Sequence, residues 1–359
     1  MIAKLLHTGD FHAGSRQYGF QQREQDYYDA ALQAIDIAVW QKVHAIILAG
    51  DNFDAAKPPA QAVRQLQHFV ERAKAKGIRV LGIEGNHDCC GGNWLNVCGI
   101  EDLTVGVVTI QGCNIIGIHG TRWNQFRERI QEMTDNQVRA DILVIHQAVA
   151  ELSDFASDFT AKEIAALVKP LGVQYVAMGD IHGYKETVVD GVRFCYPGSP
   201  EMTALDQDPV KCVEIVTCDN HVITTGTVQL KTRPFKTYQL KGETDLEQIT
   251  KDAVMEPKPL LIVKYAAGNR DLAVRAEAVL QSSGLMYRMY PVAEDTEVRD
   301  TVARRTFERR GAIQQLKGAV EDFFDLTSDE ASMVFQLLDA PDNVKACVTD
   351  YLKTKGVDV

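Results

Sequence analysis

The sequence predicts an α/β fold, because short β-rich runs alternate with helix-like stretches over about the first 200 residues. The segment between the first two β-rich runs has apolar residues at the spacing of a helix. Three later β-rich runs have no helix between them, which is typical of hairpin strands. We therefore expect a helix-flanked sheet and a second sheet that the late strands complete.

The elements follow one another in a regular order. The strands predicted in the alternating part are residues 2–9, 44–51, 78–88, 113–120, 140–147 and 173–182. The helices predicted between them are residues 23–42, 59–77 and 159–168. The second helix has a proline near its start and a glycine at its end, and the third opens with a capping box from Thr160 to Glu163. The late strands are residues 192–200, 210–218 and 221–230.

The remainder of the chain predicts two smaller units. A break falls near residues 231–245, and a strand–helix–strand module follows, with its helix at about Asp271–Gln281. Beyond it the sequence is polar and helical, and Gly311 leaves open whether the first stretch is one helix or a pair. The predicted domains are 1–232, 233–293 and 294–359.

Composition and charge limit the possible functions. No apolar run reaches the roughly 18 residues that a membrane helix needs, and the first residues lack the pattern of a signal peptide. We therefore expect a cytoplasmic protein that does not enter a membrane. The formal net charge of −11 argues mildly against binding nucleic acid by charge alone. A nucleic-acid substrate would need a local positive site, supplied by bound metal ions or a partner chain.

The eight cysteines show no convincing zinc spacing. Cys89 and Cys90 are adjacent and cannot form a C-x-x-C clamp. Cys113, Cys195 and Cys212 lie in apolar, strand-like runs. We interpret the cysteines as reduced thiols of the core.

Polar side chains follow the ends of five predicted strands. They are Asp10 and His12, Asp51 and Asp54, Asn86 with His87 and Asp88, His146, and Asp180 with His182. Ligands of α/β sheets bind beyond the carboxyl ends of the strands, so we expect these residues to meet at one rim. One such residue alone is most often a turn or a satisfied polar group, but turn chemistry does not explain five strand ends in this order.

The chemistry of this set indicates a metal centre. Carboxylate, imidazole and amide oxygen suit manganese, magnesium, iron or zinc. We expect an extended backbone to direct Asp10 and His12 to the same side, and Asp180 and His182 likewise. A glycine precedes four of the residues, and we expect it to permit a sharp turn.

The order of these residues resembles that of the calcineurin-like metallophosphoesterases. The surrounding sequence is similar to the SbcD-type nucleases, which include the archaeal and eukaryotic nuclease subunits of the break-repair complex. The matching segments are GDFHAGSRQYGFQQREQDYYDA, LAGDNFDAAKPP, IEGNHD and MGDIHGYKETVVDGVRFCYPGSPEMTA. The resemblance in sequence covers about residues 1–230. Beyond these residues only the expected arrangement of domains is similar. It implies a β-sandwich flanked by helices (αββα), a small α/β DNA-capping domain and C-terminal helices.

The resemblance also implies roles for the polar residues. One divalent ion would be held by Asp10, His12, Asp51 and His182, and a second by Asp51, Asn86, His146 and Asp180. Asp51 would bridge the two ions, which are expected to be Mn²⁺, with Mg²⁺ as the other candidate. His87 would face the scissile phosphate and protonate the leaving oxygen. Asp54 either hydrogen-bonds His87 and keeps it protonated or is a polar helix cap.

One position departs from the family pattern. The nucleases usually have G-H-x-H where this chain has Gly179, Asp180, Ile181 and His182. Asp180 therefore replaces a histidine ligand with a carboxylate, which adds a negative charge and favours hard ions. Our hypothesis is a functional centre with a shifted metal preference.

Several other residues carry weaker signals. His119 follows a strand, and we favour a role other than ligand. The residues that flank the metal motifs contact either DNA backbone or solvent, and they are Arg16, Tyr18, Arg23 and Lys57. The one basic cluster of the chain is either an exposed helix face or a DNA contact, and it comprises Arg304, Arg305, Arg309 and Arg310.

The resemblance implies a metal-dependent DNA exonuclease or endonuclease that acts with an SbcC-type coiled-coil ATPase in DNA end processing, repair or recombination. By resemblance, the C-terminal helices dock onto that ATPase and the nuclease forms a homodimer within a heterotetramer. The apolar residues of these helices could also pack back onto the chain itself. The alternatives are a metallophosphoesterase for a small phosphodiester or phosphomonoester, and a scaffold whose metal site has decayed at Asp180.

Overall fold

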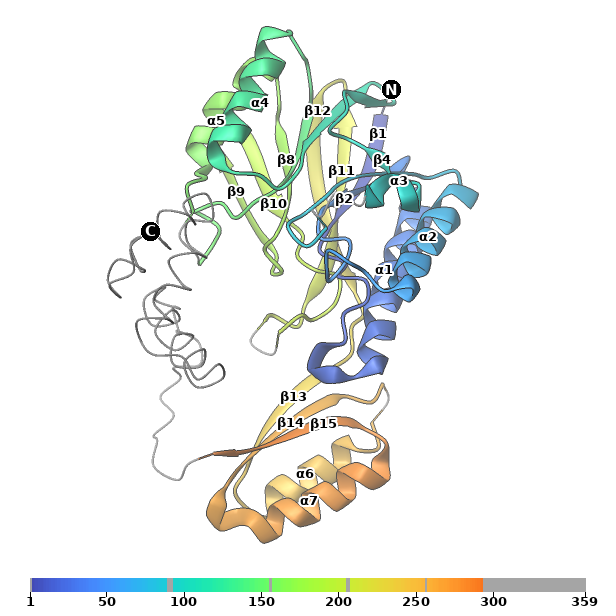
Figure 1. Ribbon diagram of the computed structural model, residues 1–359, viewed down its shortest axis with the longest axis vertical. Coiled ribbons are helices and arrows are strands. Elements are labelled where there is room, and N and C mark those ends of the chain that lie inside the picture. The colour runs from blue at the N-terminus through green and yellow to red at the C-terminus, as the bar shows by residue number, and fades with distance from the viewer. Residues whose placement is uncertain (1, 89–92, 155–156, 205–206, 256, 293–359) are drawn as a thin grey trace, which may run out of the picture. The chain divides into compact units, whose positions relative to one another are not determined.

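In a computed structural model, the described part of the chain contains two six-stranded sheets packed face to face (Figure 1). The structure describes residues 2–88, 93–154, 157–204, 207–255 and 257–292. All of these residues belong to one compact unit, Met1–Glu294. The C-terminal helices and the basic cluster predicted for residues 294–359 lie outside the described residues, as do Cys89 and Cys90.

The first sheet has the strand order β12-β11-β1-β2-β3-β4. Its strands are β1 (Ile2–Thr8), β2 (Ala45–Ala49), β3 (Arg79–Ile83), β4 (Glu101–Asp102), β11 (Lys211–Asp219) and β12 (Val222–Leu230). Strands β1 to β4 are parallel, and β11 pairs antiparallel with β1. The outer face is covered by α1 (Gln21–Gln41), α2 (Ala60–Ala75) and the short α3 (Trp94–Cys98).

The second sheet has the strand order β5-β6-β7-β8-β10-β9. Its strands are β5 (Val108–Ile110), β6 (Cys113–Ile118), β7 (Ile142–His146), β8 (Tyr175–Gly179), β9 (Lys185–Val189) and β10 (Val192–Tyr196). Helices α4 (Trp123–Asp135) and α5 (Ala161–Val168) cover its outer face. The four layers confirm the predicted α/β class and the αββα arrangement.

Three apolar clusters hold these layers together. One lies between α1, α2 and the first sheet, and another lies between α4, α5 and the second sheet. The third lies between the sheets, where fully buried side chains such as Leu5, Ile47 and Val144 meet. Strands β2 and β7 are buried on both faces. Their sequences are therefore almost continuously apolar and do not alternate between apolar and polar residues.

The expectation for the late strands was partly wrong. Only 192–200 joins the second sheet, as β10, whereas 210–218 and 221–230 extend the first sheet beside β1. Hairpin patterns identify strand neighbours in sequence but do not show which sheet a hairpin joins. Helix α4 was not predicted, although the capping box of α5 is confirmed by the Thr160 side chain, which accepts a hydrogen bond from the Glu163 amide.

A separate three-stranded parallel sheet follows the sandwich. It consists of β13 (Phe235–Leu240), β14 (Leu260–Ala266) and β15 (Met286–Val292), with α6 (Glu243–Asp252) and α7 (Arg270–Ser283) packed on it. The predicted strand–helix–strand module was therefore incomplete, because it lacked β13 and α6. Short 3₁₀ turns occupy Gln17–Gly19, Lys169–Leu171 and Ala267–Asn269. Among the described residues, no helix is both long and apolar enough to cross a membrane.

Candidate metal centre

The predicted polar residues meet where the strands of both sheets end. Asp10 follows β1, Asp51 follows β2, His146 ends β7, and Asp180 follows β8. Because these strands belong to both sheets, the candidate metal centre spans the rim of the sandwich. The sequence prediction of one common rim is consistent with this placement.

The backbone at these positions differs from the expectation. Asp10, His12, Asp51 and Asp180 all have positive φ angles, of 53°, 44°, 47° and 101°. The pairs Asp10–His12 and Asp180–His182 therefore do not share a side through an extended backbone, which was the predicted reason. The loops turn back on each other, and the amides of Asp10 and His12 donate to the carbonyls of Gly50 and Asp51, each at 3.0 Å.

The glycines at the rim are needed mainly because other chain segments pack against them closely, and less because the chain turns there. Of the glycines that precede the four polar residues, Gly50 alone has a positive φ, of 91°. A Cβ atom on Gly50 would lie 2.5 Å from Nδ1 of His146, and one on Gly85 would collide with the Asp51 carboxylate and amide. The side chains of the centre therefore fit only because these positions lack a Cβ atom.

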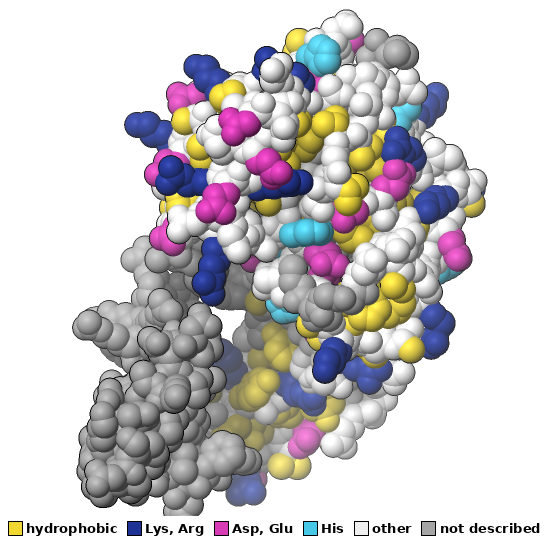
Figure 2. Space-filling view, turned by 45° about the horizontal axis from the view of Figure 1, so that its top comes forward, with side chains coloured by type: hydrophobic (Ala, Val, Ile, Leu, Met, Phe, Trp, Pro, Cys, Tyr) yellow, Lys and Arg dark blue, Asp and Glu magenta, His cyan; other side chains and the backbone are white. Residues whose placement is uncertain are grey.

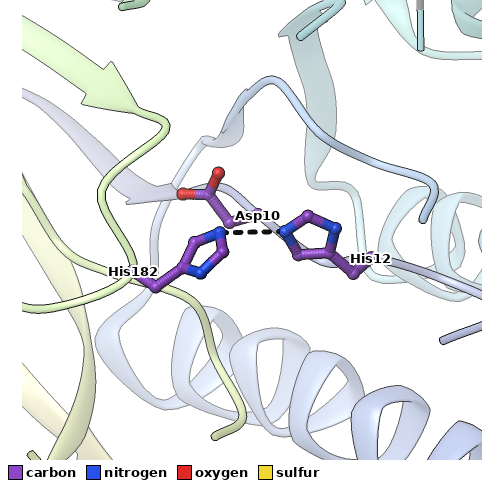
Figure 3. Close-up of side chains that lie close together, drawn as sticks. All are labelled: Asp10, His12 and His182. Atoms are coloured by element: carbon purple, nitrogen blue, oxygen red, sulfur yellow. Dashed lines mark hydrogen bonds between the residues drawn. The ribbon is translucent and has the colours of Figure 1, made fainter. Parts of the chain in front are cut away.

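A first cluster contains Asp10, His12 and His182, whose ligand atoms lie within 4.8 Å of one another. Figure 3 shows the two rings pointing toward each other beside the Asp10 carboxylate, with 3.0 Å between their Nε2 atoms. Two imidazole nitrogens this close can share a proton or bind one cation together. The other nitrogen of His182, Nδ1, lies 2.7 Å from the hydroxyl of Thr203, which fixes the orientation of the ring.

A second cluster surrounds His146. Its Nε2 atom lies 2.9 Å from Oδ1 of Asn86, 3.4 Å from Oδ1 of Asp51 and 3.8 Å from Oδ1 of Asp180. Its Nδ1 atom lies 2.8 Å from the carbonyl oxygen of Ala49. Because a carbonyl only accepts hydrogen bonds, Nδ1 is the donor and Nε2 is the nitrogen that faces the centre.

Asp51 lies between the two clusters. Its Oδ1 atom lies 3.4 Å from His146 Nε2, and its Oδ2 atom lies 4.0 Å from His12 Nε2. Each carboxylate oxygen thus faces a different cluster. This is the geometry that a bridging carboxylate requires.

Burial leaves one carboxylate oxygen of this centre without a partner. Asp10 is fully buried, and its Oδ2 atom has no hydrogen-bond partner among the described residues. A buried, unpaired carboxylate oxygen is costly unless a cation or donor satisfies it. The donor set of carboxylates, imidazoles and one amide oxygen therefore fits divalent ions such as Mn²⁺ or Mg²⁺.

Burial and neighbouring charges shift the pKa values of several groups in this centre. Burial raises the pKa of Asp10 to about 6 and lowers that of His182 to about 3. Burial opposes charge on Asp51 and His146 as well, but their mutual hydrogen bond moves the pKa of Asp51 to about 2 and that of His146 to about 10. A cation that coordinates Nε2 of His146 must therefore displace a proton.

His87 lies at the open side of the centre. Its side chain is 42% exposed, its Nε2 atom lies 3.9 Å from Oδ2 of Asp51, and its amide donates to Oδ1 of Asp51 at 2.9 Å. Its Nδ1 atom lies 2.8 Å from the main-chain carbonyl of Asp54. The predicted link between His87 and Asp54 thus runs through the main chain. The Asp54 carboxylate instead lies 3.5 Å from Nδ1 of His12.

Asp88 has a supporting position that the sequence analysis did not identify. It is fully buried and accepts hydrogen bonds from the amides of Asn52, Phe53 and Gly85 at 2.9, 2.9 and 3.2 Å. It therefore ties the loop that carries Asp51 to the loop that follows β3. The carboxylate that ends the GNHD motif was the available signal for this role.

The weaker candidates lie in different environments. His119 contacts the amide of Glu84 at 2.9 Å and the Thr104 hydroxyl at 3.2 Å, and it belongs to neither cluster. Lys57 is exposed, and Arg16, also exposed, pairs with a glutamate. Arg23 was expected on the surface but is fully buried, because it pairs with Asp26 at 2.8 Å and Glu201 at 3.2 Å.

Comparison with known proteins shows the family of the chain. The family model of the calcineurin-like phosphoesterases matches residues 3–184, just over half of the chain. The chain is 24% identical to the DNA double-strand break repair protein Mre11 of Saccharolobus solfataricus over 94% of both chains. It is 28% identical to the protein of the same name from Thermoplasma acidophilum, over 67% of this chain and 68% of that protein.

A solved structure with a similar chain course is TT1561 of Thermus thermophilus. It has a TM-score of 0.43 and 13% identity, and the match covers 63% of this chain and 99% of that chain. The resemblance predicted from the strand-end motifs is confirmed by the family model and by the Mre11 relatives. The chain belongs to the calcineurin-like phosphoesterase family.

Proposed function

We propose that this phosphoesterase is a two-metal DNA nuclease that processes broken DNA ends. The observation that supports this most is the pair of clusters that share one rim, with Asp51 facing both. The relatives named for double-strand break repair make DNA the first substrate to test.

The proposed ligand sets follow the two clusters. One ion is held by Asp10, His12, Asp51 and His182, and the other by Asp51, Asn86, His146 and Asp180. Two divalent ions held by these residues would position a phosphate and supply a hydroxide from bound water. Four of these ligands, Asp10, His12, Asp51 and His146, are buried. The carbonyl of Ala49 and the hydroxyl of Thr203 fix the orientations of two of the imidazoles.

His87 is the proposed acid. Its ring is partly exposed, and Nδ1 is held by the Asp54 carbonyl, which leaves Nε2 directed at the centre. From this position Nε2 can stabilise charge on a phosphate and protonate the leaving oxygen. Asp54 supports both histidines: its main-chain carbonyl contacts Nδ1 of His87, and its carboxylate contacts Nδ1 of His12.

Asp180 is proposed as a ligand that shifts metal preference toward hard ions. Burial raises the pKa of its carboxyl group, and the charge of the neighbouring His146 ring opposes this shift. Its Oδ1 atom lies 3.8 Å from Nε2 of the proposed ligand His146. A carboxylate here adds one negative charge to the centre and favours Mn²⁺ or Mg²⁺ over softer ions.

DNA and an ATPase subunit are the binding partners that we propose. On the upper part of the face shown in Figure 2, basic and acidic side chains are interspersed and do not gather into one basic patch. With a net charge of −11, DNA affinity would depend on the bound ions and on a partner, an SbcC-type ATPase. We further propose that residues 233–293 cap DNA, that residues 294–359 bind the ATPase, and that the nuclease is a homodimer within a heterotetramer.

The test is a nuclease assay on duplex DNA with Mn²⁺ or Mg²⁺, run beside a chromogenic phosphodiester. We expect cleavage of DNA that requires the metal and falls strongly in His87→Ala. Turnover of the small phosphodiester without cleavage of DNA would favour the small-substrate alternative. Absence of both activities with metal bound would favour a scaffold.

A further inference from the structure

A second group of metal-ligating side chains lies at the opposite end of the sandwich. The Sγ atoms of Cys113 and Cys218 and a carboxylate oxygen of Asp141 lie within 4.8 Å of one another. All three side chains are buried, at 1%, 2% and 5% exposure. We propose that this cluster binds a thiophilic divalent cation of the Zn²⁺ class and joins the two sheets.

The cluster is distinct from the candidate metal centre. Cys113 begins β6 and Asp141 immediately precedes β7, whereas His146 at the other end of β7 belongs to the catalytic rim. His146 follows Asp141 by five residue steps of extended strand, a distance of about 17 Å. The two sites therefore load independently.

The three ligands come from both sheets. Cys218 lies in β11 of the first sheet, beside Ala3 of β1, and Cys113 lies in β6 of the second. Their side chains meet in the core between the sheets. An ion held by both thiolates would therefore stabilise the sandwich at the end that lacks the catalytic loops.

Asp141 is oriented for this role by two donors. Its Oδ2 atom accepts from the amide of Asn114 at 2.7 Å, and its Oδ1 atom contacts Nδ1 of His221 at 2.7 Å. A carboxylate has about four lone-pair sites, so both oxygens retain capacity for a cation. A histidine that supports a ligating carboxylate is a common feature of protein metal sites.

His221 also occupies a conformation that favours glycine. It has a φ of 67° in the tight turn between β11 and β12, directly after Asn220 with a φ of 49°. The preferred pair for such a turn is Asn-Gly. Histidine at this position therefore contacts Asp141 and orients its carboxylate.

Ligand chemistry selects the cation. Two thiolates and one carboxylate suit Zn²⁺, which is usually four-coordinate, and disfavour Mg²⁺ and Mn²⁺. Binding releases the thiol protons, because burial raises the pKa of both Cys113 and Cys218.

The test uses Co²⁺ as a spectroscopic probe on the full chain. A thiolate bound to Co²⁺ gives a near-ultraviolet charge-transfer band that oxygen and nitrogen ligands do not give. We expect the band in the wild type, its loss in Cys113→Ala and in Cys218→Ala, and its displacement by Zn²⁺. The matched control is Cys195→Ala, since Cys195 is equally buried in the same core but lies outside the cluster.

A second control addresses the two thiols that follow His87 closely in sequence. The double variant Cys89→Ser, Cys90→Ser should keep the band, and loss of the band there would overturn the assignment. So would a wild type without the band, or a band that persists in Cys113→Ala. If the alanine variants do not fold, zinc-edge X-ray absorption of the wild type decides, with sulfur expected at about 2.3 Å from zinc. A spectrum with only oxygen and nitrogen neighbours would reject the site.

Discussion

Nε2 of His146 lies 3.4 Å from Oδ1 of Asp51, and this contact joins the carboxyl end of β7 in one sheet to the loop after β2 in the other. The candidate metal centre therefore exists only when the two sheets are packed together. The glycines at positions 50 and 85 allow this approach, because a Cβ atom at either would collide with His146 or Asp51.

Asp51→Asn should weaken binding of both ions, because each carboxylate oxygen faces a different cluster. Loss of a residue that merely supports a ligand typically lowers metal affinity about 10–100-fold, so loss of a bridging ligand should cost at least that. Calorimetric titration with Mn²⁺ measures the effect. Asp36→Asn is the control, since Asp36 is exposed and pairs with Arg72. Full loading of Asp51→Asn with two ions would contradict the bridging role.

Asp180→His should shift the metal preference without abolishing binding. Imidazole removes one negative charge and is a softer ligand, so relative affinity should move from Mg²⁺ toward Zn²⁺. Titration of wild type and variant with each metal measures the change. Unchanged affinity for every metal would show that Asp180 is not a ligand.

His87→Ala should lower turnover about 10²–10⁴-fold, the usual contribution of a general acid. Metal stoichiometry should stay at the wild-type value, because His87 is outside the proposed ligand sets. Asn96→Ala, in the exposed part of α3, is a suitable control. Wild-type turnover in His87→Ala would remove this residue from the mechanism.

Glu214 should make stability depend on pH. Burial raises the pKa of its carboxyl group from 4.5 to about 7 in the folded state. The folded state therefore holds this proton more tightly, and the resulting stability is present below pH 4.5 and lost as the pH rises through 7. The shift corresponds to about 3 kcal/mol.

Glu214→Gln should remove this dependence and make the variant more stable than the wild type at pH 8. Urea unfolding at pH 5 and pH 8 provides the measurement. Parallel changes in the two proteins between these pH values would mean that Glu214 does not titrate in this range.

Asp26→Ala should destabilise the fold by about 3–5 kcal/mol, because it leaves the buried guanidinium of Arg23 with one acidic partner fewer. The same change removes the partner of Arg233, which lies 2.6 Å away and precedes β13. Asp36→Ala breaks an exposed pair and should cost no more than about 1 kcal/mol. Equal losses in the two variants, measured by urea unfolding, would rule out a special role for the buried network.

The sequence alone predicts the strands of the alternating part of the chain, and it predicts that the polar residues after them meet at one rim. Each strand end is marked by polar residues such as Asp10 or His146 after an apolar run, and parallel strands bring such ends together. The helices with clear boundary residues, such as α5 after Thr160, are predictable for the same reason.

Other features depend on tertiary structure. The positive φ angles of Asp10, His12 and Asp51 follow from loop-to-loop hydrogen bonds that a local pattern does not encode. Burial of Arg23 depends on Glu201, which lies 178 residues further along the chain. The cluster of Cys113 and Cys218 has no zinc spacing in sequence, because its members come from different sheets.

The most direct test of the two-metal centre is anomalous diffraction from a crystal soaked in Mn²⁺. We expect two peaks about 3.5–4 Å apart, with the carboxylate of Asp51 between them. One peak should lie next to His12 and His182, and the other next to His146. Absence of manganese at this rim, or a single ion that Asp51 does not contact, would rule out the two-metal centre.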